Sequence, residues 1–365
     1  MEIKKLNENE TNVQPESEIL IQRQHRMTSI ILNRPRALNS LNLEMIRLIQ
    51  KALDKIETDE HCRFVLFYGA GDKGFCAGGD VKALARAIQQ KSVLSADMIL
   101  EQEYDMLLRL HRFSKPVIVL ADGITMGAGL GLAASADMAV ATERTRMAMP
   151  ETRIGFFPDV GSTGWMFDKC PAGYPEYLGL TGYEMNGAET VRVGFATHLS
   201  PSDRLPELIN ILEGYETNLP NSRIEAAKQL ALALDPFFEK DISANTDMDE
   251  WVAAYFKGQS SLLRLIESLR QCSIQTRLCD QVFERLAERS PTALAVTLKL
   301  LRHNEHLSLE DVFQTELSAA RFILNHPDYV EGVRARLVDK DDNPRWQPDT
   351  IEAVKDPALK RRSQG

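Results

Sequence analysis

Two acidic residues in a turn-rich segment are the first candidates for acid–base chemistry in this sequence. Glu151 and Asp159 lie in MPETRIGFFPDVG (residues 149–161), where two prolines and a glycine prevent a continuous helix. The two phenylalanines between them indicate an apolar pocket, in which desolvation and mutual repulsion would raise the pKa of at least one carboxyl group. Judged from this segment alone, Glu151 could equally begin a helix, and Asp159 could equally be a cap or turn residue.

Two glycine-rich segments could stabilise a negative charge that develops on an oxygen atom. FVLFYGAGDKGFCAGGD ends at residue 80 and PVIVLADGITMGAGLGL ends at residue 132, and each reads as a buried strand, a turn of small residues and the start of a helix. Backbone N–H groups are accessible in such turns, and losing one such donor to an oxyanion costs about 3 kcal/mol. Either segment alone fits a tight turn as well, whereas the pair favours an oxyanion site.

Other catalytic chemistries find little support in the sequence. The seven histidines are dispersed, and no GxSxG, HExxH or clustered Cys/His spacing occurs. A Ser-His-Asp hydrolase is therefore disfavoured, and no metal site is expected.

Strand and helix patterns alternate in the first half of the chain and must position these segments. Apolar runs predict strands at 19–22, 28–32, 64–68 and 117–120. Between the second and third of them, one apolar face predicts a helix over Leu43–Ile56, with Asn42 as its N-cap. In the second half the pattern is helical, with helices expected at 205–212, 223–234, 249–256, 261–270, 275–288, 292–302 and 309–325.

These patterns predict an α/β protein with an α-helical C-terminal part. We expect a core over residues 17–205 and a helical region over 206–355 that packs on it. A short disordered arm is expected over residues 1–16 and a solvated tail over 356–365.

Composition and charge limit the partners of the protein. A net charge of -9 opposes nucleic-acid binding, and no run of the 365 residues matches the ~18–20 apolar residues of a membrane span. Five cysteines without CxxC spacing fit reduced, mostly buried thiols, and the N-terminus lacks an apolar signal region. We therefore expect a cytoplasmic protein without nucleic-acid or membrane partners, and a homo-oligomer stays open.

The motifs taken together resemble a known superfamily. FCAGGD, GITMGAGLGL and MPETRIGFFPDVG are similar to segments of the enoyl-CoA hydratase/isomerase (crotonase) superfamily, and within it to the 3-hydroxyisobutyryl-CoA hydrolase family. The likeness continues through LTGYEMNGAETVRVGFATHLSPSD, SPTALAVTLKLL and HPDYVEGVRARLVDKDDNPRW, so that it spans roughly residues 17 to 355. It implies a crotonase-type ββα spiral core with a C-terminal α-helical subdomain.

The resemblance also implies roles for the residues of the acyl site. The backbone N–H groups of Gly79 and Ala128 would form an oxyanion hole for a thioester carbonyl, and Ala128, where glycine is commoner, keeps that donor. Glu151 and Asp159 match catalytic and substrate-binding carboxylates of the hydrolases. Glu103, which by residue type alone reads as a solvated charge, matches a substrate-contacting glutamate.

Coenzyme A would be bound near the NRP turn and the first glycine-rich loop. By resemblance, the backbone of Ala37, Leu38 and Ala77 would hold its adenine and pantetheine, and Asp80 and Lys73 would also contact the substrate. Arg34 and Arg36 are further basic candidates near this place, although spacing alone assigns none of these charges to a phosphate. Because coenzyme A enters as part of an acyl-CoA substrate, no separate cofactor is expected.

Gly131 separates two activities of the superfamily. In enoyl-CoA hydratases this position resembles a second catalytic glutamate, which works with the equivalent of Glu151 to add water to a double bond. Its absence favours hydrolysis of a short-chain 3-hydroxyacyl-CoA, with 3-hydroxyisobutyryl-CoA, an intermediate of valine degradation, as the expected substrate. An enoyl-CoA hydratase/isomerase and a non-catalytic CoA-binding scaffold are the alternatives.

Overall fold

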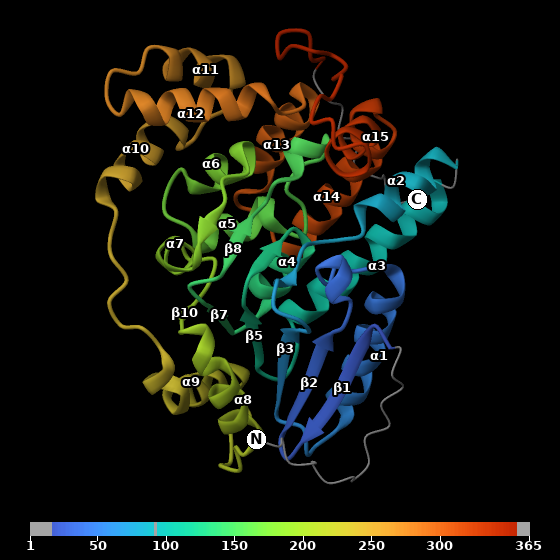
Figure 1. Cartoon of the computed structure of the whole chain (residues 1–365), viewed down its shortest axis with the longest axis vertical. Coiled ribbons are helices and arrows are strands. Elements are labelled where there is room, and N and C mark those ends of the chain that lie inside the picture. The colour runs from blue at the N-terminus through green and yellow to red at the C-terminus, as the bar shows by residue number, and fades with distance from the viewer. Residues whose placement is uncertain (1–16, 91–92, 356–365) are drawn as a thin grey trace, which may run out of the picture.

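The computed structural model describes residues 17–90 and 93–355, so the arm and the tail expected at the two ends of the chain lie outside it. The strands form two sheets (Figure 1). The larger sheet contains, in spatial order, β1 (Ile19–Gln24), β2 (Met27–Leu32), β3 (Phe64–Gly69), β5 (Val117–Ala121), β7 (Met138–Ala141) and β10 (His198–Leu199). The smaller sheet contains β4 (Gly74–Cys76), β6 (Ile124–Met126), β8 (Arg146–Ala148) and β9 (Met185–Asn186). The four strands predicted from apolar runs are present and extend one or two residues further than predicted.

The chain alternates between the two sheets. After the antiparallel hairpin of β1 and β2, strands β2, β3, β5 and β7 are parallel, and parallel neighbours need a crossover connection. The crossover from β2 to β3 runs through α1, whereas the next two first add a short strand to the smaller sheet and then continue as helix, so that β3 is followed by β4, α2 and α3, and β5 by β6 and α4. This repeated strand-strand-helix unit is the ββα spiral that the resemblance implied.

The helices of the first half follow from apolar spacing and capping. They are α1 (Leu43–Thr58), α2 (Val81–Gln89), α3 (Val93–His111), α4 (Ala128–Ser135), α5 (Ser162–Lys169), α6 (Tyr174–Thr181) and α7 (Gly187–Val193). In α1 the buried residues recur every three or four positions, and Oδ1 of Asn42 accepts a hydrogen bond from Met45 N at 2.9 Å. The predicted N-cap is thus confirmed.

From Leu205 to Val333, all of the regular secondary structure is helical. They are α8 (Leu205–Glu213), α9 (Arg223–Leu234), α10 (Thr246–Phe256), α11 (Leu262–Arg270), α12 (Thr276–Ala287), α13 (Pro291–Asn304), α14 (Leu309–Leu324) and α15 (Pro327–Val333). The single-turn helices are η1 (Pro35–Ala37), η2 (Glu151–Ile154), η3 (Ser202–Arg204), η4 (Asp235–Phe237) and the π-helical η5 (Arg334–Val338). The seven helices predicted for this half are confirmed, with ends that differ from the predicted ones by at most three residues.

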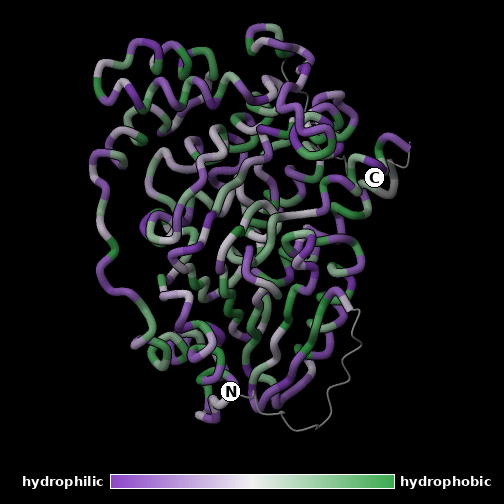
Figure 2. Tube along the Cα trace, in the orientation of Figure 1, coloured by the Kyte–Doolittle hydropathy of each residue, from purple (hydrophilic) through white to green (hydrophobic). Residues whose placement is uncertain are grey.

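Helices cover both faces of the larger sheet. Along β3, Phe64 and Leu66 pack with α8 and α9, whereas Val65 and Phe67 face the main core, as the two-residue period of a strand requires. Figure 2 shows hydrophobic segments gathered where these strands lie, with mixed colours along the outer helices. The main core continues from the strands to α13 and α15, so the division of the chain at residue 205 stays a prediction. Within the described part of the chain, no helix has both the length and the apolar character needed to cross a membrane.

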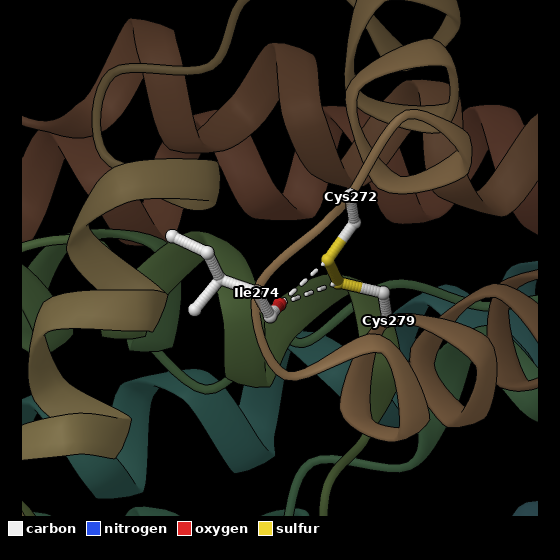
Figure 3. Close-up of a disulfide and its surroundings, with 3 residues drawn as sticks. All are labelled: Cys272, Ile274 and Cys279. Carbon is white, nitrogen blue, oxygen red and sulfur yellow. Dashed lines mark hydrogen bonds between the residues drawn. A yellow bond between two sulfur atoms is a disulfide. The ribbon is translucent and has the colours of Figure 1, made fainter.

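One expectation about the cysteines is wrong. Cys62, Cys76 and Cys170 are free thiols, but Cys272 and Cys279 form a disulfide (Figure 3). The connection between α11 and α12 reverses the chain and brings the two Cα atoms to 6.5 Å, within the range that a disulfide can bridge. Sequence spacing does not reveal such a turn, which is why these two residues were expected to be reduced.

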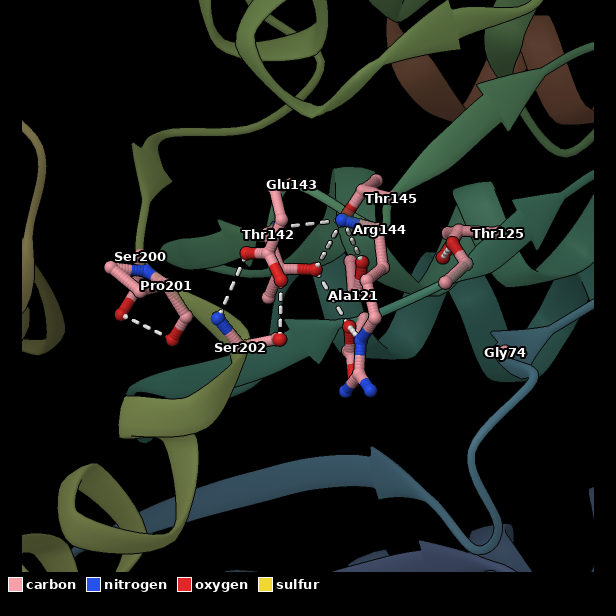
Figure 4. Close-up of polar contacts among 12 residues, drawn as sticks. Gly74, Ala121, Thr125, Thr142, Glu143, Arg144, Thr145, Ser200, Pro201 and Ser202 are labelled. Atoms are coloured by element: carbon pink, nitrogen blue, oxygen red, sulfur yellow. Dashed lines mark hydrogen bonds and ion pairs between the residues drawn. The ribbon is translucent and has the colours of Figure 1, made fainter.

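A threonine network fixes the connection from β7 to β8, which leads to Glu151. Oγ1 of Thr145 donates to Ala121 O at the end of β5 and accepts from Thr142 N at 2.7 Å (Figure 4). Glu143 in the same turn accepts a hydrogen bond from Ser202 N at 2.9 Å. These bonds tie the turn both to β5 and to the segment after β10, and thereby fix where β8 begins.

Arg223 joins α9 to the sheet. Its Nε lies 2.9 Å from both carboxylate oxygens of Asp137, and its Nη1 donates to three carbonyl oxygens between residues 110 and 113, at the end of α3. If an apolar side chain replaced this guanidinium, Asp137 would lose its cationic partner and keep only the hydrogen bond from Val117 N.

We expect Arg223→Met to lower the free energy of unfolding by about 3 kcal/mol, because a mostly buried charge loses its partner. Lys228→Met on the same helix is the matched control, since the exposed pair of Lys228 with Glu225 is worth less than about 1 kcal/mol. Urea unfolding of the three proteins measures both values. Equal losses in the two variants would contradict the role given to Arg223.

Candidate active site

Three neighbouring parallel strands of the smaller sheet end at one place. β4, β6 and β8 pair in this order, and the carboxyl ends of parallel strands lie at the same edge of a sheet. Gly79 follows β4, Ala128 follows β6 and Glu151 follows β8, each two or three residues after its strand ends. The topology therefore brings together three residues that are far apart in the sequence.

The turns after β4 and β6 approach each other too closely for side chains. Gly78 has φ +106° and Gly127 has φ +49°, and both values lie in the region that favours glycine. A β-carbon on Gly78 would lie 3.3 Å from Met126 O and 3.7 Å from Ala128 N. The glycines at these places are required by the contact between the turns.

Two backbone N–H groups are available at this contact. Leu41 N donates to Gly78 O and Asp80 N donates to Leu41 O, so the N–H of Gly79 between them points away from Leu41. Ala128 is the first residue of α4, and the first N–H groups of a helix have no partner inside it. The two donors predicted for the oxyanion hole thus belong to turns that touch each other.

Three buried carboxyl groups surround this contact. Glu103, Glu151 and Asp159 are 5%, 8% and 7% exposed. A β-carbon on Gly79 would lie 3.2 Å from Oε2 of Glu103, and one on Gly127 would lie 3.1 Å from Oε1 of Glu151. Glu103, expected from residue type alone to be a solvated charge, is therefore placed beside the first turn by α3.

Burial controls the protonation of the three groups. It raises the pKa of Glu103 to about 8, together with repulsion by Asp159. Burial, and then repulsion by Asp159, also raises the pKa of Glu151 well above its ordinary value, and Oε2 of Glu151 has no hydrogen-bond partner within the described residues. The pKa of Asp159 rises only to about 6, because a hydrogen bond from Tyr104 opposes the effect of burial. The set therefore combines carboxyl groups with different proton affinities, as acid–base catalysis requires.

Aromatic side chains lie close to the buried carboxyl groups. The hydroxyl group of Tyr104 donates to Oδ2 of Asp159 at 2.8 Å. Phe156 stacks on Phe157 with ring centroids 4.6 Å apart, and Tyr329 of α15 lies 5.5 Å from Phe156. The two phenylalanines predicted the apolar surroundings of the site, whereas no pattern in the sequence indicated either tyrosine. No local pattern distinguishes Tyr104 from other buried helical residues.

The residues expected to bind coenzyme A also gather. Ala77 N donates to Leu38 O at 3.0 Å, so the segment of η1 runs beside the first glycine-rich turn. A cavity of about 200 Å³ is lined by Pro35, Arg36, Leu38, Asn39, Ala70, Asp72, Lys73 and Gly74.

Two charged candidates are engaged elsewhere. The side chain of Asp80 accepts a hydrogen bond from Ala83 N as the N-cap of α2 and pairs with Arg34 at 3.3 Å. Arg34 also pairs with Glu18 at 3.1 Å. Of the basic candidates, Arg36 and Lys73 line the cavity and Arg34 does not.

The space that a side chain at position 131 would occupy is filled by neighbouring side chains. A β-carbon there would lie 2.9 Å from Cβ of Val160 and 3.0 Å from Cδ1 of Leu107. A glutamate at this position would clash with both residues. The absence of a carboxylate at position 131 is therefore part of the packing of this chain.

A metal site is not evident in this region. Among residues 17–90 and 93–355, no three or more His, Cys, Asp or Glu side chains are grouped so as to hold a metal ion.

The sequence from residue 27 to 362 matches the enoyl-CoA hydratase/isomerase family. The chain belongs to this family. The crotonase-type α/β fold expected from the motifs is confirmed by this match and by the solved structures that the chain resembles.

Relatives and solved structures of the enoyl-CoA hydratase/isomerase family cover most of the chain. The 3-hydroxyisobutyryl-CoA hydrolase, mitochondrial, of Danio rerio is 36% identical over 93% of this chain and 87% of its own. The protein of the same name from Homo sapiens is 32% identical over 92% of this chain and 86% of its own. Among solved structures, a carnitinyl-CoA dehydratase from Mycobacterium thermoresistibile has a TM-score of 0.84 at 31% identity and covers 94% of this chain and 95% of its own. An enoyl-CoA hydratase from Rhodobacter sphaeroides 2.4.1 has a TM-score of 0.82 at 30% identity, covering 93% and 95%.

The cytoplasmic location expected from the sequence is contradicted by these relatives. Both hydrolases are mitochondrial by name. The expectation rested on cysteine spacing and on the lack of an apolar signal region at the N-terminus, and neither distinguishes one compartment that keeps thiols reduced from another.

We expect Glu103→Gln to weaken the pH dependence of stability. Because the folded protein raises the pKa of Glu103 from 4.5 to about 8, it holds this proton more tightly than the unfolded chain, and stability falls as the pH rises between these values. The free energy of unfolding of Glu103→Gln should therefore fall less than that of wild type between about pH 5 and pH 8. Glu44→Gln, exposed on α1, is the control and should follow wild type. Parallel curves for all three proteins would contradict the buried titration of Glu103.

Proposed function

We propose that this chain hydrolyses a short-chain 3-hydroxyacyl-CoA thioester, with 3-hydroxyisobutyryl-CoA as its substrate. The relatives from Danio rerio and Homo sapiens carry the name of this reaction and cover about nine tenths of the chain. Coenzyme A enters as part of the substrate, so the reaction needs no cofactor. The charge of -9 disfavours a nucleic acid as a further partner.

The observation that carries the proposal is the arrangement of carboxyl groups around the two turns. Glu151 and Asp159 are both buried there, and Val160 and Leu107 fill the space that a second glutamate at position 131 would need. Hydration of a double bond by two glutamates is disfavoured, because this site lacks the second glutamate at position 131. Hydrolysis needs one carboxylate to activate the attack on the carbonyl carbon and donors for the oxygen, and both are at hand.

The proposed reaction begins with the thioester oxygen between Gly79 N–H and Ala128 N–H. Glu151 either removes a proton from the water that attacks the carbonyl carbon or attacks that carbon itself. In both routes the C–S bond breaks, the thiolate takes up a proton to give free coenzyme A, and water supplies the second oxygen of the acid. The N–H donors stabilise the charge on the carbonyl oxygen in the transition state of either route.

Asp159 is proposed to recognise the 3-hydroxyl group of the substrate. One of its oxygens accepts from Tyr104, which leaves the other for a hydroxyl donor in the pocket. The cavity beside Leu38 and Lys73 would bind a portion of coenzyme A. The phosphates of coenzyme A are negatively charged, and Lys73 and Arg36 in the cavity lining are positively charged.

Addition of water to an enoyl-CoA is the second candidate function. It is favoured by the titles of the two solved structures with TM-scores above 0.8, a carnitinyl-CoA dehydratase and an enoyl-CoA hydratase. The oxyanion donors would serve this reaction as well, because it passes through an enolate. The filled space at Gly131 weighs against it.

A non-catalytic CoA-binding scaffold is less consistent with the site. Burial of three carboxyl groups costs stability, and a protein that only binds coenzyme A has no need of them beside the carbonyl donors. Groups with such displaced pKa values are typical of sites that transfer protons.

We expect Glu151→Gln to lower thiol release by about 10²-fold or more, since it removes the ionisable group and keeps its volume. Binding of the CoA ester, measured by calorimetry, should change little. In wild type, kcat/KM should fall as the pH is lowered, with an apparent pKa above the ordinary 4.5 of a glutamate, because Glu151 must lose its proton to act. A variant that keeps more than about a tenth of the wild-type rate would contradict this role.

A panel of acyl-CoAs tests the proposed substrate. Thiol release and loss of enoyl absorbance are followed in parallel, and we expect 3-hydroxyisobutyryl-CoA to be cleaved much faster than isobutyryl-CoA. Asp159→Asn should lower this preference together with the rate, because a site built around a hydroxyl group rejects analogues that lack it. Equal kcat/KM values for the two esters would show that Asp159 does not recognise the 3-hydroxyl group. Loss of enoyl absorbance without thiol release would select the hydratase.

A further inference from the structure

A further buried glutamate lies close to the segment that carries Asp159. Glu316 belongs to α14, more than 150 residues after Asp159 in the sequence, and its side chain is 0% exposed. It stands within the apolar stripe of its helix, between Phe313 and Leu317, where an unpartnered charge would be costly. Its partners explain why it is tolerated there.

Within the described residues, the carboxyl group of Glu316 accepts its hydrogen bonds from the segment that follows Asp159. Oε2 accepts from Gly161 N at 2.6 Å. Oε1 accepts from Thr163 N at 3.1 Å and from Oγ1 of Thr163 at 2.6 Å. Gly161 is the N-cap of α5 and supplies no side chain, so the carboxyl group of Glu316 replaces the missing cap.

The segment that Glu316 holds is strained. Val160, between Asp159 and Gly161, has φ +55°, a conformation that β-branched residues adopt at a cost. Its carbonyl oxygen accepts from Trp165 Nε1 at 3.1 Å, and its side chain fills the space above Gly131. Without donors and acceptors that fix this backbone, the chain would relax toward an ordinary β-region conformation and turn Asp159 with it.

A further set of contacts joins Glu316 to the same loop. Nδ2 of Asn304 donates to Oγ1 of Thr163 at 2.7 Å, and Thr315, beside Glu316, donates to Oδ1 of Asn304 at 2.8 Å. Phe313, one turn earlier on α14, lies against Gly161 and 5.5 Å from the ring of Tyr104, the donor to Asp159. One helix of the C-terminal region thus touches both the backbone next to Asp159 and the partner of its side chain.

We infer that Glu316 is a positioning residue for Asp159, which holds the strained turn at Val160 and Gly161 and so sets where the Asp159 carboxyl group meets the substrate. This inference rests on the proposed hydrolysis, in which Asp159 contacts the acyl group. Glu316 itself touches the backbone and Thr163, not the substrate.

Glu316→Gln is the variant that tests the inference. In wild type, three donors bind the two carboxyl oxygens of Glu316. Glutamine keeps only one of these oxygens, and its NH₂ group would face at least one N–H group of the turn without being able to accept from it. We expect kcat for 3-hydroxyisobutyryl-CoA to fall by about 10- to 100-fold, as misplacement of a reacting group does, with little change in the dissociation constant of the CoA ester. Glu176→Gln is the matched control: it removes another buried carboxylate, which accepts from Gly258 N and pairs with Arg302, and kcat should stay near that of wild type.

The double variant that combines Glu316→Gln with Asp159→Asn distinguishes a positioning role of Glu316 from a general structural role. If Glu316 acts through Asp159, the double variant loses no more activity than Asp159→Asn alone. Losses that multiply, or a Glu316→Gln enzyme as active as wild type, would overturn the inference. Should Glu316→Gln not fold, Thr163→Val, which removes one donor to Glu316, and Thr163→Ser, which keeps it, take its place, with loss expected only in the former. A wild-type enzyme that releases no thiol would instead overturn the proposed hydrolysis.

Discussion

Backbone donors from two turns can meet at one carbonyl oxygen only if no side chain stands between them. In this protein the condition is met at Gly78, Gly79 and Gly127, and the parallel pairing of β4, β6 and β8 brings the turns together. The close contact in turn leaves room for carboxyl groups directly beside the glycines, which is where Glu103 and Glu151 lie. Fold topology, glycine positions and acid–base groups thus follow from one packing requirement.

Burial of several carboxyl groups at this contact must be offset elsewhere. Tyr104 stabilises the ionised form of Asp159, and burial raises the pKa of Glu316 to about 8 although hydrogen bonds from Thr163 and Gly161 oppose this rise. Burial also raises the pKa of Glu103 and of Glu151. The helices after residue 205 contribute to this balance, since α14 supplies Glu316 and α15 supplies Tyr329. The C-terminal region is therefore part of the site as well as of the core.

Much of this arrangement could be predicted from the sequence, because its signals are local. Apolar periodicity predicted four of the six strands of the larger sheet and the helices from α8 to α14, and the resemblance to the family indicated Glu151 and Asp159. Contacts between distant segments left no such signal. The bond from Tyr104 to Asp159 depends on how α3 crosses the sheet, and the disulfide of Cys272 with Cys279 depends on a tight turn. Glu316 left one trace, a charge within an apolar helical stripe, and its partners 155 and 153 residues away could not be read from it.

The central claim is that Gly79 N–H and Ala128 N–H bind the thioester carbonyl beside Glu151. It is tested most directly by the isotope-edited infrared spectrum of the carbonyl group of 3-hydroxyisobutyryl-CoA bound to Glu151→Gln, which holds the ester without cleaving it. Two converging donors polarise the C=O bond, so we predict a stretching frequency below that of the same ester in water. A frequency equal to or above the value in water would contradict the oxyanion hole and the account built on it.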